Sequence, residues 1–378
     1  MVLLFLAGCE NTEEHPKKPG ALNSLVTELV NLEVEGNSTI YFERATEGWL
    51  YIESDSPVVL DGNSISLSAG ETMRFVSAGR HSVSVSSGHI TIRAIPEIIF
   101  YDFHPPTSGV VRTWEDIKKY DIWNNYNVMV SEGDIDRYAD YVAEWREKGG
   151  KWIRNAYVKN TSRGRGPDQW HEMMIDPRSD GIIVDEFTKR MGEFFPKWAE
   201  IIRGIANDPA SEGKMFYGYV HHHPLKVYRP LLEALLGHGY KAVPMVYYQE
   251  YATEWKAETI SGWANRGIAK WPKVYPGSTL GQVVVALCPV DRGSAKHRWN
   301  RYPHVDFKVH LEKQFYALAN SPATVGLGGI SFWRAHYVSE ETMGHFNALV
   351  RHYLIEGNTK RLFDYPYVLP AKDEAQNE

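Results

Sequence analysis

Residues 181–187 read Gly181-Ile182-Ile183-Val184-Asp185-Glu186-Phe187, an uncharged run that ends in two adjacent carboxylates and an aromatic ring. Such an apolar run is typical of a strand that is buried on both faces, as in a parallel sheet. Burying two unpaired carboxylates costs several kcal/mol by order of magnitude. We therefore place Asp185 and Glu186 at the carboxyl end of the strand, where parallel α/β folds carry their chemistry.

A purely local role is the alternative interpretation of these polar residues. Asp185 or Thr188 would then serve as the N-cap of the helix that follows the strand, because Asp and Thr side chains accept hydrogen bonds from the first helical turn. Our working hypothesis is the acid/base site.

Strand-like and helix-like segments alternate from residue 97 onward, which is the pattern of an α/β fold. Apolar runs predict strands at 98–104, 127–132, 152–158, 181–187, 215–220, 242–248, 283–288 and 328–334. Helices are expected at 134–149, 188–205, through 231–236, through 315 and from 339. Eight strands match a closed (β/α)8 TIM barrel. An open doubly wound sheet is the structural alternative, but no glycine-rich phosphate loop follows the first strand.

The segment before the barrel is predicted to be a small all-β sandwich. Short runs at 39–42, 49–52, 56–60, 73–76, 81–85 and 89–93 are strand-like and are separated by glycine turns such as Asp61-Gly62-Asn63. We expect residues 1–25 to hold a signal and tether, 26–96 the sandwich and 97–378 the catalytic barrel. The sandwich is either a carbohydrate-binding module or a spacer; few of its strand positions carry exposed aromatics, so we favour the spacer.

Composition limits the classes of ligand. The 378 residues carry a net charge of −6, so no basic surface recommends a nucleic-acid partner. The 12 Trp and 22 Tyr are numerous, and many fall in predicted loops, where aromatic rings suit stacking against sugars. The two cysteines, Cys9 and Cys288, provide no disulfide framework, and Cys288 lies in an apolar run typical of the core. We expect a monomer without cofactors.

If the barrel closes, polar residues at its strand ends converge on one mouth. The set is rich in carboxylates, imidazoles and aromatics, and it contains no Gly-x-Ser-x-Gly elbow. Its members are Asp102, His104, Glu132, Asn155, Asp185, Glu186, His221, His223, Tyr247, Tyr248, Gln249, Glu250, Asp291, Trp333, Arg334 and His336.

Glycosidic bond hydrolysis fits this set of residues. The reaction needs a proton donor at the leaving oxygen and a group that supports an oxocarbenium-like carbon. Glu186 suits the first role, because a carboxyl beside the negative Asp185 is expected to hold its proton. Asp185 would orient the substrate or the water, and Glu250 or Asp102 would supply the second carboxylate. Consecutive strand residues point to opposite faces, so both can face the bore only where the strand has ended.

Three segments resemble strands of chitinase and β-hexosaminidase-like barrels. Residues 181–186 are similar to their fourth strand, and the Asp185-Glu186 pair is most like that of β-hexosaminidases. Residues 243–247 are similar to the sixth strand of chitinases, and residues 328–333 are similar to the eighth. In chitinases a Trp at the end of the eighth strand forms the base of the sugar subsite, and Trp333 is at the matching position here. The resemblance implies that Glu186 protonates the glycosidic oxygen and that Asp185 polarises an acetamido group. The chitinase Asp-x-x-Asp-x-Asp-x-Glu run is absent, and spherulin-like and polygalactosaminidase-like barrels share the same outline.

The predicted function is therefore hydrolysis of a polysaccharide or glycan. Glu186, Asp185 and Glu250 are the catalytic candidates. The substrate-binding candidates are Asp102, His104, Asn155, His221, His223, Tyr247, Tyr248, Trp333 and Arg334. One alternative is a metal-dependent hydrolase or deacetylase that uses Asp102, His104, His221 and His223. The other is a glycan-binding surface lipoprotein without catalysis. No metal is expected in the favoured reading.

The N-terminus predicts export. Leu6-Ala7-Gly8-Cys9 resembles a bacterial lipobox, and the resemblance implies cleavage before Cys9 and lipidation of its thiol. The segment lacks a basic start, and its apolar run is at the short end for a signal peptide. We expect a secreted, periplasmic or surface-anchored bacterial protein whose one membrane contact is the lipid.

Overall fold

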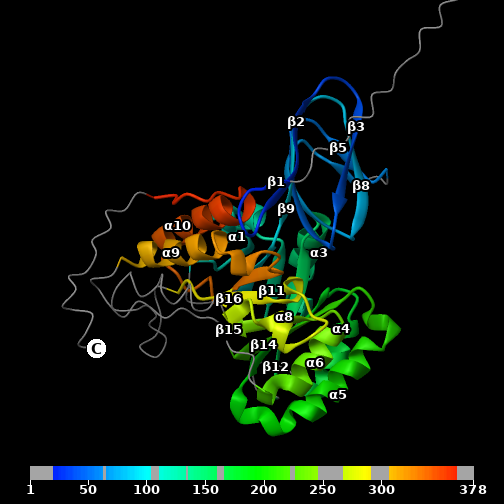
Figure 1. The fold of residues 1–378 in the computed structure, drawn as a ribbon, viewed down its shortest axis with the longest axis vertical. Coiled ribbons are helices and arrows are strands. Elements are labelled where there is room, and N and C mark those ends of the chain that lie inside the picture. Colours follow the sequence, from blue (N-terminus) through cyan, green and yellow to red (C-terminus); the bar gives the residue numbers. More distant parts are fainter. Residues whose placement is uncertain are drawn as a thin grey trace, which may run out of the picture.

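The computed structural model describes residues 20–62, 65–103, 110–132, 135–159, 166–221, 226–245, 267–290 and 306–363. Eight parallel strands close into a barrel in chain order, which confirms the predicted (β/α)8 architecture. Figure 1 shows this barrel with its helices outside and the N-terminal strands as a separate lobe.

The barrel strands match the apolar runs of the sequence to within a few residues. They are β10 (Glu97–Phe103), β11 (Val128–Ser131), β12 (Lys151–Tyr157), β13 (Gly181–Phe187), β14 (Met215–His221), β15 (Lys241–Met245), β16 (Val284–Leu287) and β17 (Gly329–Phe332). Ladder pairs join β17 back to β10, for example Ile330 to Ile98. Both faces of these strands are buried because the bore and the helices cover them.

The helices lie between the strands and end as the sequence suggests. They are α1 (Trp114–Lys119), α2 (Ile122–Asn125), α3 (Ala139–Glu147), α4 (Trp170–Ile175), α5 (Phe195–Ala206), α6 (Arg229–Gly237), α8 (Trp271–Val274), α9 (Phe307–Ala319) and α10 (Glu340–Val350). Short 3-10 segments are η1 (Ile135–Tyr138), η2 (Pro167–Gln169), η3 (Lys189–Phe194), η4 (Pro209–Ser211), η5 (Lys226–Tyr228), η6 (Leu280–Gln282) and η7 (Pro322–Thr324), and a π-helical turn is η8 (Arg351–Ile355).

Two predicted helices begin as 3-10 segments. In the helix expected at 134–149, residues Ile135–Tyr138 form η1 and α3 begins at Ala139. The sequence predicts an α-helix from residue 188, but residues Lys189–Phe194 form the 3-10 segment η3 and the α-helix α5 begins at Phe195. Pro196 stands in the first turn of α5, where its missing N–H costs nothing and its fixed φ favours a helix start. The start of α10 is as expected, because the Ser339 hydroxyl accepts a hydrogen bond from the Thr342 N–H.

Two antiparallel sheets precede the barrel and pack face to face as a sandwich. One sheet has the order β1 (Gly20–Ala21), β2 (Thr27–Val34), β9 (Gly88–Ile95), β4 (Gly48–Ser54), β7 (Gly70–Val76). The other has the order β3 (Ser38–Arg44), β8 (Gly79–Val85), β5 (Val58–Leu60), β6 (Ile65–Leu67). Side chains from both sheets, such as Ile52 and Val83, share one apolar core of their own.

The sandwich docks on the amino-terminal end of the barrel strands. The ammonium of Lys151, the first residue of β12, lies 3.4 Å from the ring centroid of Phe75 in β7. Arg351 donates two hydrogen bonds of 2.6 Å to the two carboxylate oxygens of Glu71, and a third of 3.1 Å to the Tyr51 hydroxyl. The carboxyl ends of the strands, with Asp185, lie at the opposite end of the barrel.

Replacing Arg351 with methionine should weaken the contact between the sandwich and the barrel. The pair is about one-third exposed, so we expect the free energy of unfolding to fall by about 1 kcal/mol at neutral pH. The hydrogen bonds from Arg351 lower the pKa of Glu71, so the stabilisation is present above the ordinary Glu pKa and is lost as pH falls through the lowered one. Denaturant unfolding of R351M at neutral and acid pH checks this, with Arg203→Met on the exposed face of α5 as the control. An equal effect of the two variants at neutral pH contradicts it.

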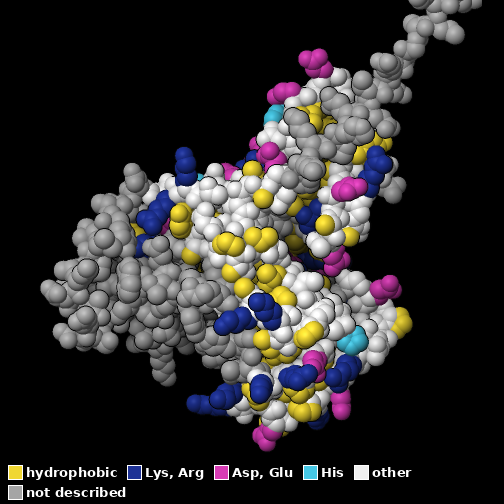
Figure 2. All heavy atoms as spheres, in the orientation of Figure 1, with side chains coloured by type: hydrophobic (Ala, Val, Ile, Leu, Met, Phe, Trp, Pro, Cys, Tyr) yellow, Lys and Arg dark blue, Asp and Glu magenta, His cyan; other side chains and the backbone are white. Residues whose placement is uncertain are grey.

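The described surface carries charges of both signs. In Figure 2 basic and acidic side chains are mixed on the visible face of the sandwich and of the barrel, in keeping with the small net charge. No helix in the described ranges has the length and apolar character needed to cross a bilayer.

Candidate active site

A β-bulge shapes the carboxyl end of β13. Ladder pairs with β14 run regularly from Gly181 to Val184, and the register then shifts before Phe187 pairs with Val220. Within this shift Glu186 has a φ of 63°, in the left-handed region that non-glycine residues seldom adopt. The extra residue breaks the strict alternation of the strand. The conflict noted from the sequence, that adjacent residues must point to opposite faces, therefore does not apply here.

The bulge separates residues that face the bore from residues that face the helices. Ile183 and Asp185 are ladder partners of Asn155 and Tyr157 on β12, so these side chains share the inner face. Phe187 points outward, and its ring centroid lies 5.4 Å from that of Trp198 on α5. Asp185 is half-buried and Glu186 is exposed.

Asp185 is in an environment that holds a proton. Burial, and after it the charges of Glu186 and Glu132, together raise the pKa of its carboxyl to about 7. The N–H of Glu186 and the guanidinium of Arg334 act in the opposite direction. A carboxylic acid that titrates near neutrality is suited to general acid/base work.

Neither capping interpretation is supported by the structure. Asp185 lies inside β13, and its carboxylate accepts from its neighbour Glu186 rather than from a helical turn. Thr188 occupies the position before η3 but makes no side-chain capping hydrogen bond. The polar residues after the apolar run are therefore not explained by the start of a helix.

The two strands before β13 add a hydrogen-bonded cluster to the same end of the bore. Tyr157 donates its phenol hydrogen to Oε1 of Glu132, which follows β11. The Nδ2 of Asn155 lies 3.4 Å from the same oxygen and 3.2 Å from the Tyr157 hydroxyl. The Tyr101 hydroxyl on β10 donates to Oδ1 of Asn155 at 2.9 Å. Three residues on two strands, Tyr157 and Asn155 on β12 and Tyr101 on β10, thus hold the Glu132 carboxylate in place.

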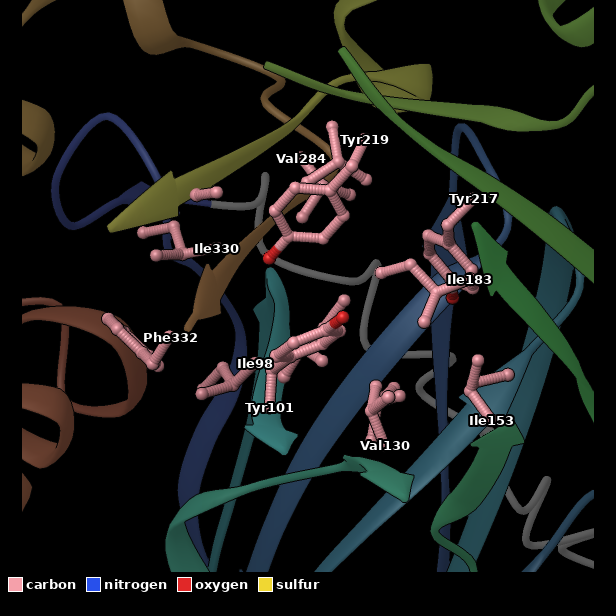
Figure 3. Packing of buried hydrophobic residues seen from close by; sticks show 14 of the residues in the cluster. Ile98, Tyr101, Val130, Ile153, Ile183, Tyr217, Tyr219, Val284, Ile330 and Phe332 are labelled. Atoms are coloured by element: carbon pink, nitrogen blue, oxygen red, sulfur yellow. The ribbon is translucent and has the colours of Figure 1, made fainter. Parts of the chain in front are cut away.

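Aromatic side chains close the bore beneath this cluster. The rings of Tyr101 and Tyr219 lie 5.3 Å apart between centroids, as Figure 3 illustrates. The Tyr219 hydroxyl is 2.9 Å from the hydroxyl of Ser331 on β17. All three residues are at most 1% exposed. Buried side chains therefore fill the bore beneath the cluster, so a ligand would have to approach Asp185 from the carboxyl end of the barrel.

The end of β17 contributes the other face of the site. Trp333 and Arg334 directly follow β17, whereas the sequence predicts them as the last residues of the strand, and the guanidinium carbon of Arg334 lies 4.4 Å from the Trp333 ring centroid. Arg334 has a φ of 53°. Two of the four non-glycine residues with positive φ in the described ranges, Glu186 and Arg334, thus lie beyond the carboxyl ends of barrel strands. Backbone strain of this kind clusters at functional sites.

The structure brings together Asp185, Glu186, Asn155 and Arg334 of the predicted site residues, with Trp333 beside Arg334. Other predicted side chains lie outside the described ones: Cys9, Asp102, His104, His221, His223, Tyr247, Tyr248 and Glu250. The four residues of the metal alternative are all among these. The described side chains contain no group of three metal-ligating residues.

Some residues of the cluster were not singled out from the sequence. The sequence predicts a place at the mouth but no role for Glu132, and it predicts Tyr101, Tyr157 and Tyr219 only as members of strands. Their signal is a period of two: Asn155 and Tyr157 share one face of β12, as Tyr217 and Tyr219 share one face of β14. Cys288 is a core residue as predicted, because it is buried and burial raises the pKa of its thiol to about 12.

Several solved structures superpose on this chain with low TM-scores and low sequence identity. No known protein family and no curated protein matches the sequence. A chitinase from Chromobacterium violaceum superposes with a TM-score of 0.47 at 12% identity, covering 69% of this chain and 99% of that one. A GH18 chitinase from Flavobacterium johnsoniae superposes with a TM-score of 0.42 at 10% identity, covering 70% of this chain and 98% of the chitinase. A thermostable mutant of a xylanase from Cellvibrio japonicus superposes with a TM-score of 0.40 at 10% identity, covering 63% of this chain and 86% of the xylanase. The (β/α)8 assignment rests on the strand pairing of the closed barrel itself.

Proposed function

We propose that this chain hydrolyses glycosidic bonds of a polysaccharide or glycan at the carboxyl end of its barrel. The observation that carries the proposal is the Asp185-Glu186 bulge, where a carboxyl with a pKa of about 7 lies next to a second, exposed carboxylate. Enzymes that cleave glycosides use two carboxyl groups in different environments, one protonated and one ionised. Here Asp185 would be the protonated carboxyl, and a neighbouring carboxylate would be the ionised one.

The chemistry requires one proton transfer and one water. A protonated carboxyl of the pair gives its proton to the glycosidic oxygen as the bond from that oxygen to the anomeric carbon breaks. The carbon, which develops positive charge, is stabilised by a carboxylate on the same site and receives the oxygen of a water molecule. The proton released by that water restores the carboxyl, so atoms and charge balance over one turnover.

The rim of the site suits a sugar. Trp333 presents a partly exposed aromatic ring, and Arg334 provides hydrogen-bond donors beside it. Rings and donors in this arrangement bind the apolar face and the hydroxyls of a pyranose. Tyr247, Tyr248, Glu250, His104 and His223 stay predictions for the same rim. Export and lipidation at Cys9, and a monomeric state, also stay proposals from the sequence.

A digestion screen tests the proposal. The full-length protein, the double variant D185N/E186Q and the control Glu200→Gln on the exposed face of α5 are incubated with a broad panel of polysaccharides and glycans. Released reducing ends are then measured with and without a chelator. We expect at least one substrate that the parent and E200Q cleave, with or without chelator, and that the double variant leaves intact.

Two results count against the proposal. If the double variant cleaves at the parental rate, the catalytic residues are not Asp185 and Glu186 on β13. Cleavage that stops with the chelator and returns with added zinc favours the metal-dependent alternative, whose predicted ligands are Asp102, His104, His221 and His223.

A further inference from the structure

Glu132 is a carboxylate of this site for which no sequence motif predicts a role. It follows β11, two residues beyond Val130, and it is half-buried. Its Oε1 accepts from the Tyr157 hydroxyl and from Asn155. Asn155 is in turn fixed by Tyr101 through a hydrogen bond of 2.9 Å. A side chain held from two neighbouring strands keeps its position without help from a substrate.

The cluster reaches Asp185 through the sheet register. Tyr157 on β12 is the ladder partner of Asp185 on β13, and β12 pairs on its other side with β11. Neighbouring strands lie about 4.8 Å apart, so Glu132 and Asp185 flank Tyr157 at the same end of the bore. The order across the sheet is Glu132, Tyr157, Asp185.

We propose that Glu132 is a positioning residue: held by Tyr157 and Asn155, it places a fixed negative charge beside Asp185 and so makes Asp185, rather than Glu186, the proton donor of the site. This inference rests on the proposed function and names the residue that assigns its roles. Glu132 itself stays two strands away from the reacting carboxyl and acts through it.

The charges around Asp185 support this division of roles. Glu186 faces it from its own strand, Glu132 from the β11 side and Arg334 from the β17 side, while Tyr157 is the titratable neighbour on β12. Burial, then Glu186, then Glu132 raise the pKa of Asp185 to about 7. Glu186 is exposed, so salt and water screen its effect, whereas the half-buried Glu132 is screened less. Glu132 thus gives the contribution that persists at physiological salt.

A titration of Asp185 tests the inference without any substrate. The carboxyl carbon of Asp185 is followed by NMR against pH in the full-length protein and assigned by its loss in D185N. We expect Glu132→Gln, which keeps an acceptor for Tyr157 but removes the charge, to lower the midpoint by about one pH unit at both low and high salt. The matched control Glu200→Gln should leave the midpoint unchanged, and the shift caused by E186Q should shrink at high salt.

A second variant and a kinetic readout keep the test decisive. Tyr157→Phe frees the Glu132 carboxylate while keeping its charge, and we expect a midpoint between those of the parent and E132Q. On a cleaved substrate, the alkaline limb of kcat/KM should move to lower pH in E132Q, whereas a merely structural role would lower kcat/KM at every pH without moving the limb.

The failures are distinguishable. An Asp185 midpoint that stays at the parental value in E132Q and Y157F overturns the inference, whether or not the parent cleaves a glycan. A parent that cleaves no substrate of the panel overturns the proposed function instead, and the midpoint then reports on the Glu132 charge alone.

Discussion

Asparagine in place of Asp185 should lower kcat/KM by about 10²–10⁴-fold below neutral pH, the usual contribution of a general acid. The amide keeps the size of the side chain but has no proton to give to the leaving oxygen. The Glu186→Gln variant should lose less because it keeps the proton donor, although it removes the neighbouring carboxylate and lowers the pKa of Asp185. Rates of the two single variants on one substrate measure this difference. A larger loss in E186Q than in D185N would return the acid role to Glu186, as the sequence alone suggested.

The pH dependence of the parent follows from the same carboxyl. With its pKa raised to about 7, Asp185 is protonated below that value and ionised above it. A general acid works in its protonated form, so kcat/KM should fall as pH rises through about 7. A profile that instead rises through neutral pH would mean that the ionised form of Asp185 is the active one.

Two controls separate lost chemistry from lost structure. Substrates whose leaving group needs no proton, such as glycosyl fluorides, should be cleaved by D185N nearly as well as by the parent. Since the folded protein raises the pKa of Asp185, its ionised form costs stability as pH rises above the unfolded value. D185N should therefore be at least as stable as the parent at alkaline pH. Equal losses on both kinds of substrate would contradict the acid role.

Alanine in place of Glu97 should lower the free energy of unfolding by about 3–5 kcal/mol. Glu97 begins β10 at the amino-terminal end of the bore, and its side chain is 1% exposed. One carboxylate oxygen accepts from the Tyr217 hydroxyl and the other from the ammonium of Lys241, each at 2.6 Å. Removing the carboxylate leaves a nearly buried ammonium without its counter-charge, which is the costly case for a buried pair. Denaturant unfolding of the variant gives the value.

A double variant isolates the cause. When Glu97→Leu is combined with Lys241→Met, both charges are replaced by apolar groups and no unpaired ion is left. We expect this double variant to be more stable than E97A. If it is less stable, lost packing rather than the unpaired Lys241 explains the effect, and the ion pair has a smaller role in the barrel floor.

The fold was largely predictable because its strands are buried on both faces. Continuous apolar runs such as Ile182–Val184 identify such strands directly, and glycines mark many of their ends. Less regular elements were harder to identify. The strand β2 lies in the predicted all-β region, but Glu28, Asn31 and Glu33 interrupt its apolar residues. The 3-10 segment of residues 189–194 contacts α5, which follows it, and η5, which lies further along the chain, and local sequence does not encode the second contact.

The position of the candidate carboxylates in the fold was predictable from the sequence, and their local geometry was less so. Asp185 and Glu186 stand out because carboxylates follow a buried strand. Their bulge is a property of the pairing with β14, which comes thirty residues later in the chain, so no local pattern reveals it. The contact of Glu132 with Tyr157 likewise joins residues 25 positions apart. These contacts, and not the identity of the pair, determine which carboxyl holds the proton.

The position of a bound substrate is the most direct measurement of the central claim that bonds are cleaved beside β13. A crystal structure of D185N/E186Q with an oligosaccharide that the parent cleaves would supply it. We expect the scissile oxygen to lie within hydrogen-bond distance of the side chain at position 185. We also expect a sugar ring to pack on the Trp333 side chain. An oligosaccharide bound on the sandwich, or at the mouth with its scissile bond out of reach of residues 185 and 186, would contradict it.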